Sequence, residues 1–140
     1  MKSKFFGMFV TILIILLLGA GGYIAFLLMD DADQGGEPTV DEILDATWET
    51  EEITTNLANN DIIRIQFSVQ LDNKKAREEI EKRDFQVYNA IINELSSMES
   101  SHFREKDSLQ SLEERLTAKI DELLHNGKVV RVYTTQKIIQ

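Results

Sequence analysis

The sequence predicts a single transmembrane helix followed by a small α+β domain, in which two helices pack on an antiparallel sheet in the order β-β-α-α-β. Three observations predict this arrangement. Residues 5–29 contain no charged side chain, residues 61–71 alternate apolar and polar side chains, and residues 109–124 repeat leucine and isoleucine at helical spacing. Helices packed on one face of a small sheet bury such apolar faces, and this packing defines the α+β class.

The N-terminal apolar run is long enough to cross a membrane. Its 25 residues would form a helix about 37 Å long, whereas the hydrocarbon core of a bilayer is about 30 Å thick. A cleaved secretory signal has an apolar core of about 7–15 residues that ends at small residues. Here the residues from Tyr23 to Met29 stay apolar after a glycine-rich stretch, so we expect an uncleaved anchor. A cleaved signal and a buried helix of a soluble protein are the alternatives.

The charges beside the run predict its orientation. Lys2 and Lys4 lie in a tip formed by residues 1–4, and basic residues stay on the cytoplasmic side of a membrane. We therefore expect the N-terminal tip inside the cell and the C-terminal part outside, with the bilayer around residues 5–29.

Small residues within the run predict a face that packs on another membrane helix. Gly21 and Ala25 are four residues apart, and Gly19 and Gly22 lie beside them. This spacing of small residues lets two helix backbones approach closely. The alternative is that they reflect only the high frequency of glycine in membrane helices.

The composition of the remaining chain excludes several classes of function. Residues 30–140 are enough for one small domain. They carry 13 basic and 24 acidic side chains, a net charge of −11, which repels phosphate backbones and argues against nucleic-acid binding. The chain contains no cysteine, which excludes disulfides, iron–sulfur clusters, thiol nucleophiles and cysteine-ligated zinc.

Residues 30–46 predict an acidic tether followed by a short helix. The first nine of these residues read DDADQGGEP and offer nothing to bury. Thr39 and Glu42 then have the spacing of a capping box, in which each side chain accepts a hydrogen bond from the backbone of the other. We expect a short helix from Thr39 to Ala46.

Four apolar side chains in and after this helix are candidate contacts for a partner protein: Val40, Ile43, Leu44 and Trp48. The first three follow the capping box on one helix face. Aromatic side chains dominate binding hot spots, which favours Trp48 as an anchor for a partner. The alternative is that Trp48 packs in the core or at the rim of the domain.

Three segments of the domain, residues 47–140, have the pattern of β-strands. Residues 61–71 alternate apolar and polar side chains, which predicts a strand with one buried face. Residues 48–57 are rich in β-formers and precede an Asn59-Asn60 turn signal, so the two segments predict an antiparallel hairpin. Residues 129–140 are β-branched, and we expect them beside the hairpin in the same sheet.

Two helices are predicted between these strands. Residues 73–98 place apolar side chains at a period of about 3.6, after two charge-dense turns. A second helix begins at Asp107, which we expect to cap it with Gln110 at the third position. Asn126 and Gly127 are expected to end that helix.

The chain offers no recognisable catalytic, cofactor or metal site. His102 and His125 are the only histidines, and neither has the spacing of convergent metal ligands. The serines of residues 96–101 lack the context of a nucleophile, and no glycine-rich phosphate loop is present. These patterns favour a binding or structural role over an enzyme.

The order of these parts resembles the flagellar basal-body-associated FliL family. A short tip, one span, an acidic tether and a terminal α+β domain cover nearly the whole chain. Thr55-Asn56-Leu57, ahead of the alternating strand, resembles the NL segment of that family. Its central helix is matched by Ile91, Ile92 and Leu95.

The last residues strengthen the resemblance. Residues 127–140 read GKVVRVYTTQKIIQ and look like the terminal V-Y-F-T-x-F-x-I-Q pattern of the family. Thr134 and Lys137 stand where that pattern has its two aromatic residues. Aromatic packing at these two positions is therefore not carried over to this chain.

The resemblance implies a non-enzymatic, single-pass protein of the bacterial inner membrane, with a stomatin-like outer domain. It implies association with the flagellar basal body and its stator units, and assembly into homo-oligomeric rings or partial rings. It also implies a role in motor rotation, swimming or swarming, and chemotaxis. The alternative is a membrane-anchored binding or scaffolding module of another envelope assembly, such as a secretion or sensing accessory.

Overall fold

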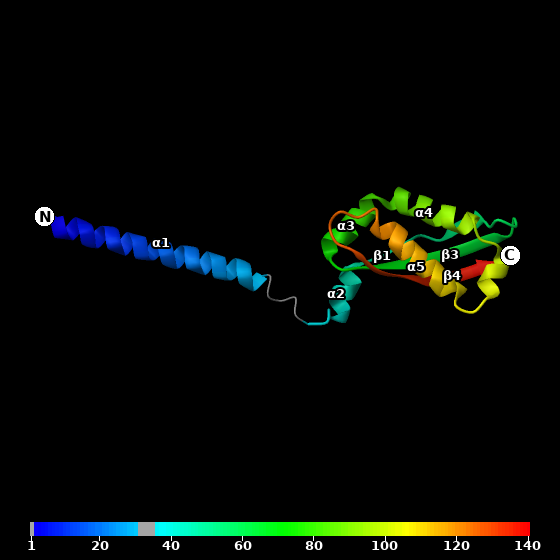
Figure 1. Cartoon of the computed structure of the whole chain (residues 1–140), viewed down its shortest axis with the longest axis horizontal. Coiled ribbons are helices and arrows are strands. Elements are labelled where there is room, and N and C mark those ends of the chain that lie inside the picture. Colours follow the sequence, from blue (N-terminus) through cyan, green and yellow to red (C-terminus); the bar gives the residue numbers. More distant parts are fainter. Residues whose placement is uncertain (1, 31–35) are drawn as a thin grey trace. The chain divides into compact units, whose positions relative to one another are not determined.

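The computed structural model describes residues 2–30 and 36–140 of the chain (Figure 1). The chain divides into two compact units, Met1–Glu37 and Pro38–Gln140, and each unit is described by itself. Most of the tether predicted over residues 30–38 lies outside the described residues.

The first unit is one helix, α1 Lys2–Asp30 (Figure 1). It confirms the helix predicted over residues 5–29 and extends it at both ends. The segment Phe6–Ala25 has a mean hydropathy of 2.4, and none of it is buried. By length and composition α1 is the one helix in the described parts of the chain that could cross a membrane.

The second unit is a mixed α and β domain with a small antiparallel sheet. Its elements, in chain order, are α2 Val40–Asp45, β1 Thr47–Glu49, β2 Ile53–Asn56, β3 Ile62–Leu71, α3 Lys74–Lys82, α4 Asp84–Ser96, the 3₁₀ helix η1 Ser100–Arg104, α5 Ser108–Asp121 and β4 Val129–Ile139.

The strand β3 is the centre of the sheet and pairs antiparallel with the other three strands. It pairs with β4 over residues 63–71, with β1 over residues 68–70 and with β2 over residues 62–65. Because β4 occupies one edge of β3 along nearly its whole length, β1 and β2 follow one another along the other edge. The predicted antiparallel pairing of residues 61–71 with the preceding β-segment is confirmed, and so is the place of the C-terminal segment beside it in the same sheet.

The prediction of a single strand over residues 48–57 was wrong, because a bulge divides this segment into β1 and β2. Three residues, 50–52, face two residues of β3 between the paired positions Glu49 and Ile53. Thr50 is buried in the bulge, where its hydroxyl accepts a hydrogen bond from the N–H of Phe67 at 3.0 Å. The Thr50 carbonyl accepts from Gln66 Nε2, also at 3.0 Å. The Thr50 hydroxyl therefore takes the place of a backbone carbonyl as the acceptor for the Phe67 N–H.

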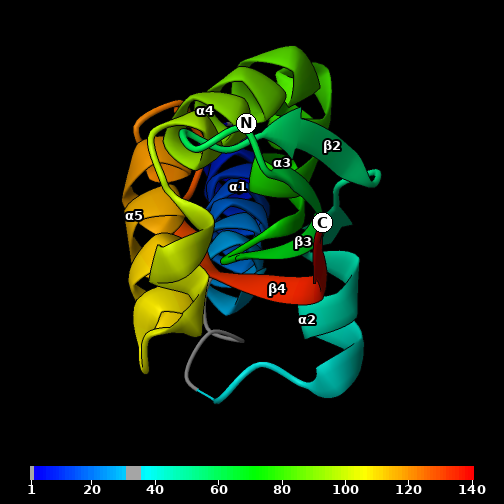
Figure 2. The same cartoon turned by 90° about the vertical axis from the view of Figure 1, so that its right-hand side faces the viewer.

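The core lies between the sheet and the helices α3, α4 and α5, which cover one of its faces (Figure 1 and Figure 2). Alternate residues of β3 are buried, as the period of two predicts. The fully buried side chains that the helices contribute are Ala76, Ile80, Val87, Ile91, Leu95, Leu112, Leu116 and Ile120. The helical spacing of these residues follows the predicted apolar stripes.

The prediction of one long helix over residues 73–98 was also wrong, because this segment forms two helices. The break lies at Arg83, whose backbone leaves the helical region at φ −107° and ψ 16°. This change of direction lets α3 pack over β1 and α4 over β2. The apolar period continues across the break, so the sequence pattern did not reveal it. The helix η1, which carries the buried Phe103, was not predicted.

The predicted ends of the last helix were wrong. Asp107 has a left-handed backbone with φ 68°, and its side chain makes no capping hydrogen bond with α5. At the other end α5 stops at Asp121, ahead of Gly127. Gly127 has φ +113° and shapes the turn into β4, where an added Cβ would collide with the side chains of Asp72 and Asn73.

Candidate interaction surfaces

The apolar side chains of α1 form an open surface in the first unit. Every described side chain between Phe6 and Ala25 is exposed. A Cβ built at Gly19, Gly21 or Gly22 meets nothing within 4 Å. Residues three and four apart share a helix face, so Ala25 lies on the same side as Gly21 and Gly22. These four positions are uncovered in this unit, and the packing expected at them stays a prediction.

The helix α2 begins with the predicted capping box. The N–H of Thr39 donates to Glu42 Oε2 at 2.7 Å, and the N–H of Glu42 donates to Thr39 Oγ1 at 3.3 Å. The bond from the Thr39 N–H lowers the pKa of Glu42, and the bond from its hydroxyl adds to the effect. These bonds fix the start of a helix that has no buried residue.

The apolar side chains of α2 face outward. Val40 is 72% exposed and Leu44 is 64% exposed, while Ile43 is half-buried. Beside Leu44 lies a shallow hollow of about 430 Å³, bordered by the charged residues Arg77 and Glu81. Arg77 Nε is buried and has no hydrogen-bond partner among the described residues. The exposed Val40 and Leu44 side chains, beside a hollow with charged walls, are the accessible part of this surface.

Trp48 lies mainly in the core of the domain, as the alternative interpretation of the sequence held. It is 9% exposed, and its ring meets the ring of Tyr88 edge to face, with centroids 6.1 Å apart. The Tyr88 hydroxyl accepts a hydrogen bond from the N–H of Glu51 at 2.7 Å, which ties α4 to the bulge between β1 and β2. Because its ring is already packed, Trp48 contributes little surface to a partner.

His102 takes part in a contact within its own turn, whereas His125 contacts Glu79 of α3. His125 Nδ1 lies 3.1 Å from Glu79 Oε1, and the Glu79 carboxylate also accepts from the N–H groups of His125 and Asn126. Burial by itself would raise the pKa of Glu79, but these hydrogen bonds lower it to about 2. His102 Nδ1 accepts from the N–H of Glu99 at 3.2 Å. No group of three or more metal-ligating side chains occurs among the described residues.

A buried carboxylate on α4 was not singled out from the sequence. Glu94 is 7% exposed and pairs with two cations of α5, Arg115 and Lys119, the second at 2.7 Å. Burial raises the pKa of Glu94, but the hydrogen bonds from Lys119 and Arg115 outweigh it and hold the pKa below its usual range. The signal in the sequence was a single acid inside the apolar stripe of α4. These two ion pairs join α4 to α5 and have a structural role.

A row of polar side chains on α5 was also missed, and it covers part of the edge of β4. Glu113, Thr117 and Asp121 are spaced by four residues and lie on one side of the helix. They accept hydrogen bonds from backbone N–H groups of β4, namely those of Thr134 at 2.8 Å, Val132 at 3.1 Å and Val129 at 2.8 Å. The helix therefore satisfies donors that an unpaired strand edge would leave open.

Comparison with known proteins relates this domain to one family. The family model "Flagellar basal body-associated protein FliL" matches residues 47–140, from the start of β1 to the residue after β4. Flagellar protein FliL of Bacillus subtilis (strain 168) is 35% identical over 124 residues, which cover 87% of this chain and 89% of that protein. Flagellar protein FliL of Aquifex aeolicus (strain VF5) is 29% identical over 77 residues, covering 55% and 48% respectively. Since the matched model spans the whole sheet and its helices, and the Bacillus relative aligns along most of both chains, the chain belongs to the FliL family of flagellar basal body-associated proteins.

Proposed function

We propose that this chain is a non-enzymatic, membrane-anchored component of the flagellar basal body. In this role it associates with the stator units and supports motor rotation in swimming, swarming and chemotaxis. The observation that carries the proposal is the family match over residues 47–140, which places the folded domain among flagellar basal body-associated proteins. The apolar α1 supplies a candidate anchor for it.

The proposed arrangement follows from the charges and the apolar run. The tip with Lys2 and Lys4 stays in the cytoplasm, α1 crosses the inner membrane, and the domain lies outside. Residues 30–140 carry a net charge of −11, so the domain is repelled by anionic lipid head groups. The segment 30–46 then limits how far the domain extends from the membrane.

Two surfaces are proposed as contacts within the motor. The face of α1 formed by Gly19, Gly21, Gly22 and Ala25 packs beside stator helices, because small side chains permit close approach of backbones. The outward face of α2, with the exposed Val40 and Leu44, contacts a neighbouring protein beside the hollow that Arg77 and Glu81 border. We further propose that copies of the chain associate with one another in rings or partial rings.

A deletion tests the proposed function. Cells without the chain should spread less in soft agar while they assemble filaments of normal length, and the full chain supplied in trans should restore spreading. A fluorescent fusion should locate at the motor together with labelled stators. Normal spreading by the deletion strain would reject the motor role and favour another envelope assembly. Strictly monomeric behaviour of the full chain at high concentration in nanodiscs would reject the ring.

A further inference from the structure

The edge of β4 is covered by α5 only in its N-terminal half. The last hydrogen bond from β4 to α5 is the one that the N–H of Thr134 donates to Glu113, in the second turn of the helix. Beyond it, Ile62 and Gln140 exchange two backbone hydrogen bonds of 2.9 Å across the β3–β4 pair. Donors alternate along an antiparallel strand, so the N–H and C=O groups of Lys137 and Ile139 point away from β3. This second half of the edge, residues 135–139, is available to another strand.

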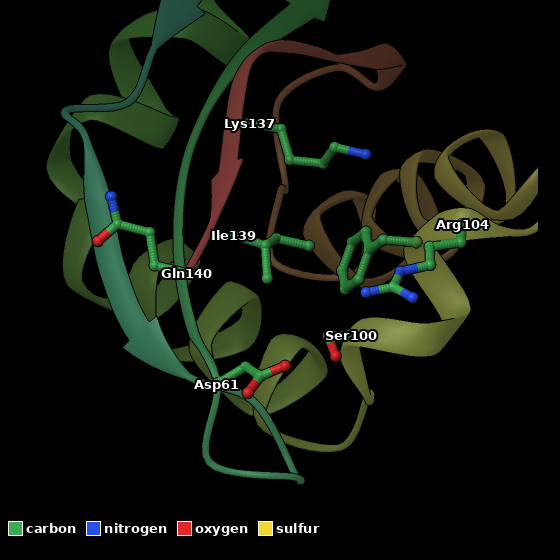
Figure 3. A pocket seen from close by; sticks show the side chains of 7 residues that line it. Asp61, Ser100, Arg104, Lys137, Ile139 and Gln140 are labelled. Carbon is green, nitrogen blue, oxygen red and sulfur yellow. The ribbon is translucent and has the colours of Figure 1, made fainter.

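A hollow of about 370 Å³ lies along this open edge, between β4 and η1 (Figure 3). Lys137 and Ile139 project into it from β4, and Arg104 projects from the opposite wall (Figure 3). The ring of Phe103 forms part of the lining, with Lys137 Nζ 5.5 Å from its centroid. The hollow therefore joins a free backbone edge to an aromatic face and two cations.

The two cations of the hollow have only weak contacts: Lys137 lies over the Phe103 ring, and the charge of Arg104 contributes to lowering the pKa of Asp61. Neither Arg104 nor Lys137 is within ion-pair distance of an acid among the described residues, and both are exposed. The one acidic side chain of the lining, Asp61, accepts a hydrogen bond from Asn59 Nδ2 at 2.9 Å. The lining side chains thus carry a net positive charge on a domain that is strongly acidic. That contrast favours a ligand with carboxylates.

We propose that residues 135–139 of β4, together with this hollow, bind an extended acidic peptide segment of a partner protein. The segment adds as a strand to the edge of β4 and pairs with the outward backbone groups of Lys137 and Ile139. Alternate side chains of the segment enter the hollow, where a carboxylate lies between Arg104 and Lys137 and an apolar group contacts Phe103. A small anion would use the cations alone and leave the backbone edge unpaired.

This inference goes beyond the proposed function, because it concerns a peptide site on the domain and does not depend on the α1 or α2 contacts. A short fluorescent peptide with the repeat Glu-Thr-Val-Thr, which puts glutamate and valine on one face of a strand, is the probe, titrated against the full chain in nanodiscs. Its twin with glutamine in place of glutamate tests charge. A second twin with N-methylated backbone amides tests strand pairing.

Three charge variants locate the site. Arg104→Glu and Lys137→Glu should each weaken binding of the acidic peptide by about tenfold or more, the loss expected for a charge-assisted hydrogen bond. Lys75→Glu changes the net charge equally on an exposed position of α3 and should leave the affinity unchanged. The glutamine peptide should bind wild type more weakly than the glutamate peptide, by a similar factor.

Hydrogen exchange gives the direct readout of strand pairing. Bound peptide should slow exchange at the amides of Lys137 and Ile139, and the N-methylated twin should not. The variant Lys137→Pro removes an outward donor that the β3–β4 ladder does not use, so it should bind less than Lys137→Ala. Unfolding curves identify any variant that has lost its fold, and if Lys137→Pro has done so, the N-methylated twin remains the test of strand pairing.

Several results would overturn the proposal. These are no binding of the peptide, equal binding of the N-methylated twin, and wild-type affinity in the Arg104→Glu, Lys137→Glu double variant. Complete displacement of the peptide by inorganic phosphate, without protection of the Lys137 and Ile139 amides, would make the hollow a simple anion site. Protection of these amides by a second copy of the chain, with no effect of the peptide, would make the edge a self-association surface. Normal motility of a deletion strain would reject the motor role and leave this peptide site intact.

Discussion

The hydroxyl of Thr50 accepts a hydrogen bond from the N–H of Phe67 at 3.0 Å, at the point where the edge of the sheet changes from β1 to β2. Both residues are buried, so this donor has no access to water. The bond compensates for a ladder contact that the bulge removes. It lets one continuous edge change register while the buried donor of the central strand remains satisfied.

Replacing Thr50 by valine should destabilise the domain. Valine has nearly the same shape but no acceptor, so the N–H of Phe67 stays buried without a partner, at a cost of about 1–3 kcal/mol. Thr50→Ser keeps the hydroxyl and serves as the control. Chemical denaturation of both variants measures the free energies of unfolding. Equal stability of the two variants would show that the bond contributes nothing.

Glu79 makes the free energy of unfolding of the domain depend on pH in the acidic range. Its pKa is lowered from 4.5 to about 2, so the folded state holds its proton less tightly than the unfolded state. The stabilisation is complete above pH 4.5 and is lost as the pH falls toward about 2. Glu79→Gln should lower the melting temperature at neutral pH and flatten its decline between pH 4.5 and 2. Glu78→Gln, on an exposed neighbour, should keep the wild-type pH profile.

The buried carboxylate of Glu94 should contribute measurably to the packing of α4 on α5. Glu94→Gln leaves Arg115 and Lys119 without their acid, and because both cations are partly exposed we expect a loss of about 1–2 kcal/mol. Glu105→Gln removes an exposed acid and should have little effect. A double-mutant cycle with Lys119→Met measures the coupling between the two helices. A coupling energy of zero would contradict this account.

Gly127 should tolerate no side chain. Its backbone has φ +113°, and an added Cβ would overlap the side chains of Asp72 and Asn73 and approach Ala76 Cβ at 2.9 Å. Gly127→Ala should lower the free energy of unfolding by about 1–3 kcal/mol. Gly36→Ala, where nothing lies within 4 Å, is the matched control in the same denaturation experiment. A neutral Gly127→Ala would mean that the turn into β4 adjusts freely.

The parts of the fold that the sequence predicted are those fixed by local periodicity. The alternation in β3, the leucine stripe of α5 and the capping box of Thr39 and Glu42 each involve residues a few positions apart. The bulge at Thr50 and the break at Arg83 depend on partners in other elements. Neither feature changes the spacing of apolar residues along the chain. From that spacing we therefore predicted one strand where there are two, and one helix where there are two.

The candidate surfaces also fall into two groups, those formed by a single helix and those formed by tertiary contacts. The small-residue face of α1 and the apolar face of α2 are properties of single helices, so the sequence located them. The placement of Trp48 depends on Tyr88, which is 40 positions further along the chain. The hollow beside β4 needs η1 and the last strand together, and the cations that line it are scattered in the sequence. Tertiary contacts create these sites, and periodicity does not encode them.

The small-residue face of α1 gives a prediction with a closely matched control. Ala25→Leu places a bulky side chain on the face formed with Gly21 and Gly22, whereas Ala20→Leu makes the same change about 140° around the helix. Both variants keep the run uncharged and apolar, so both should insert in the membrane. If the face packs on stator helices, Ala25→Leu should reduce copurification with the stators and spreading in soft agar, and Ala20→Leu should retain both. Equal behaviour of the two variants, at equal membrane levels, would limit α1 to anchoring.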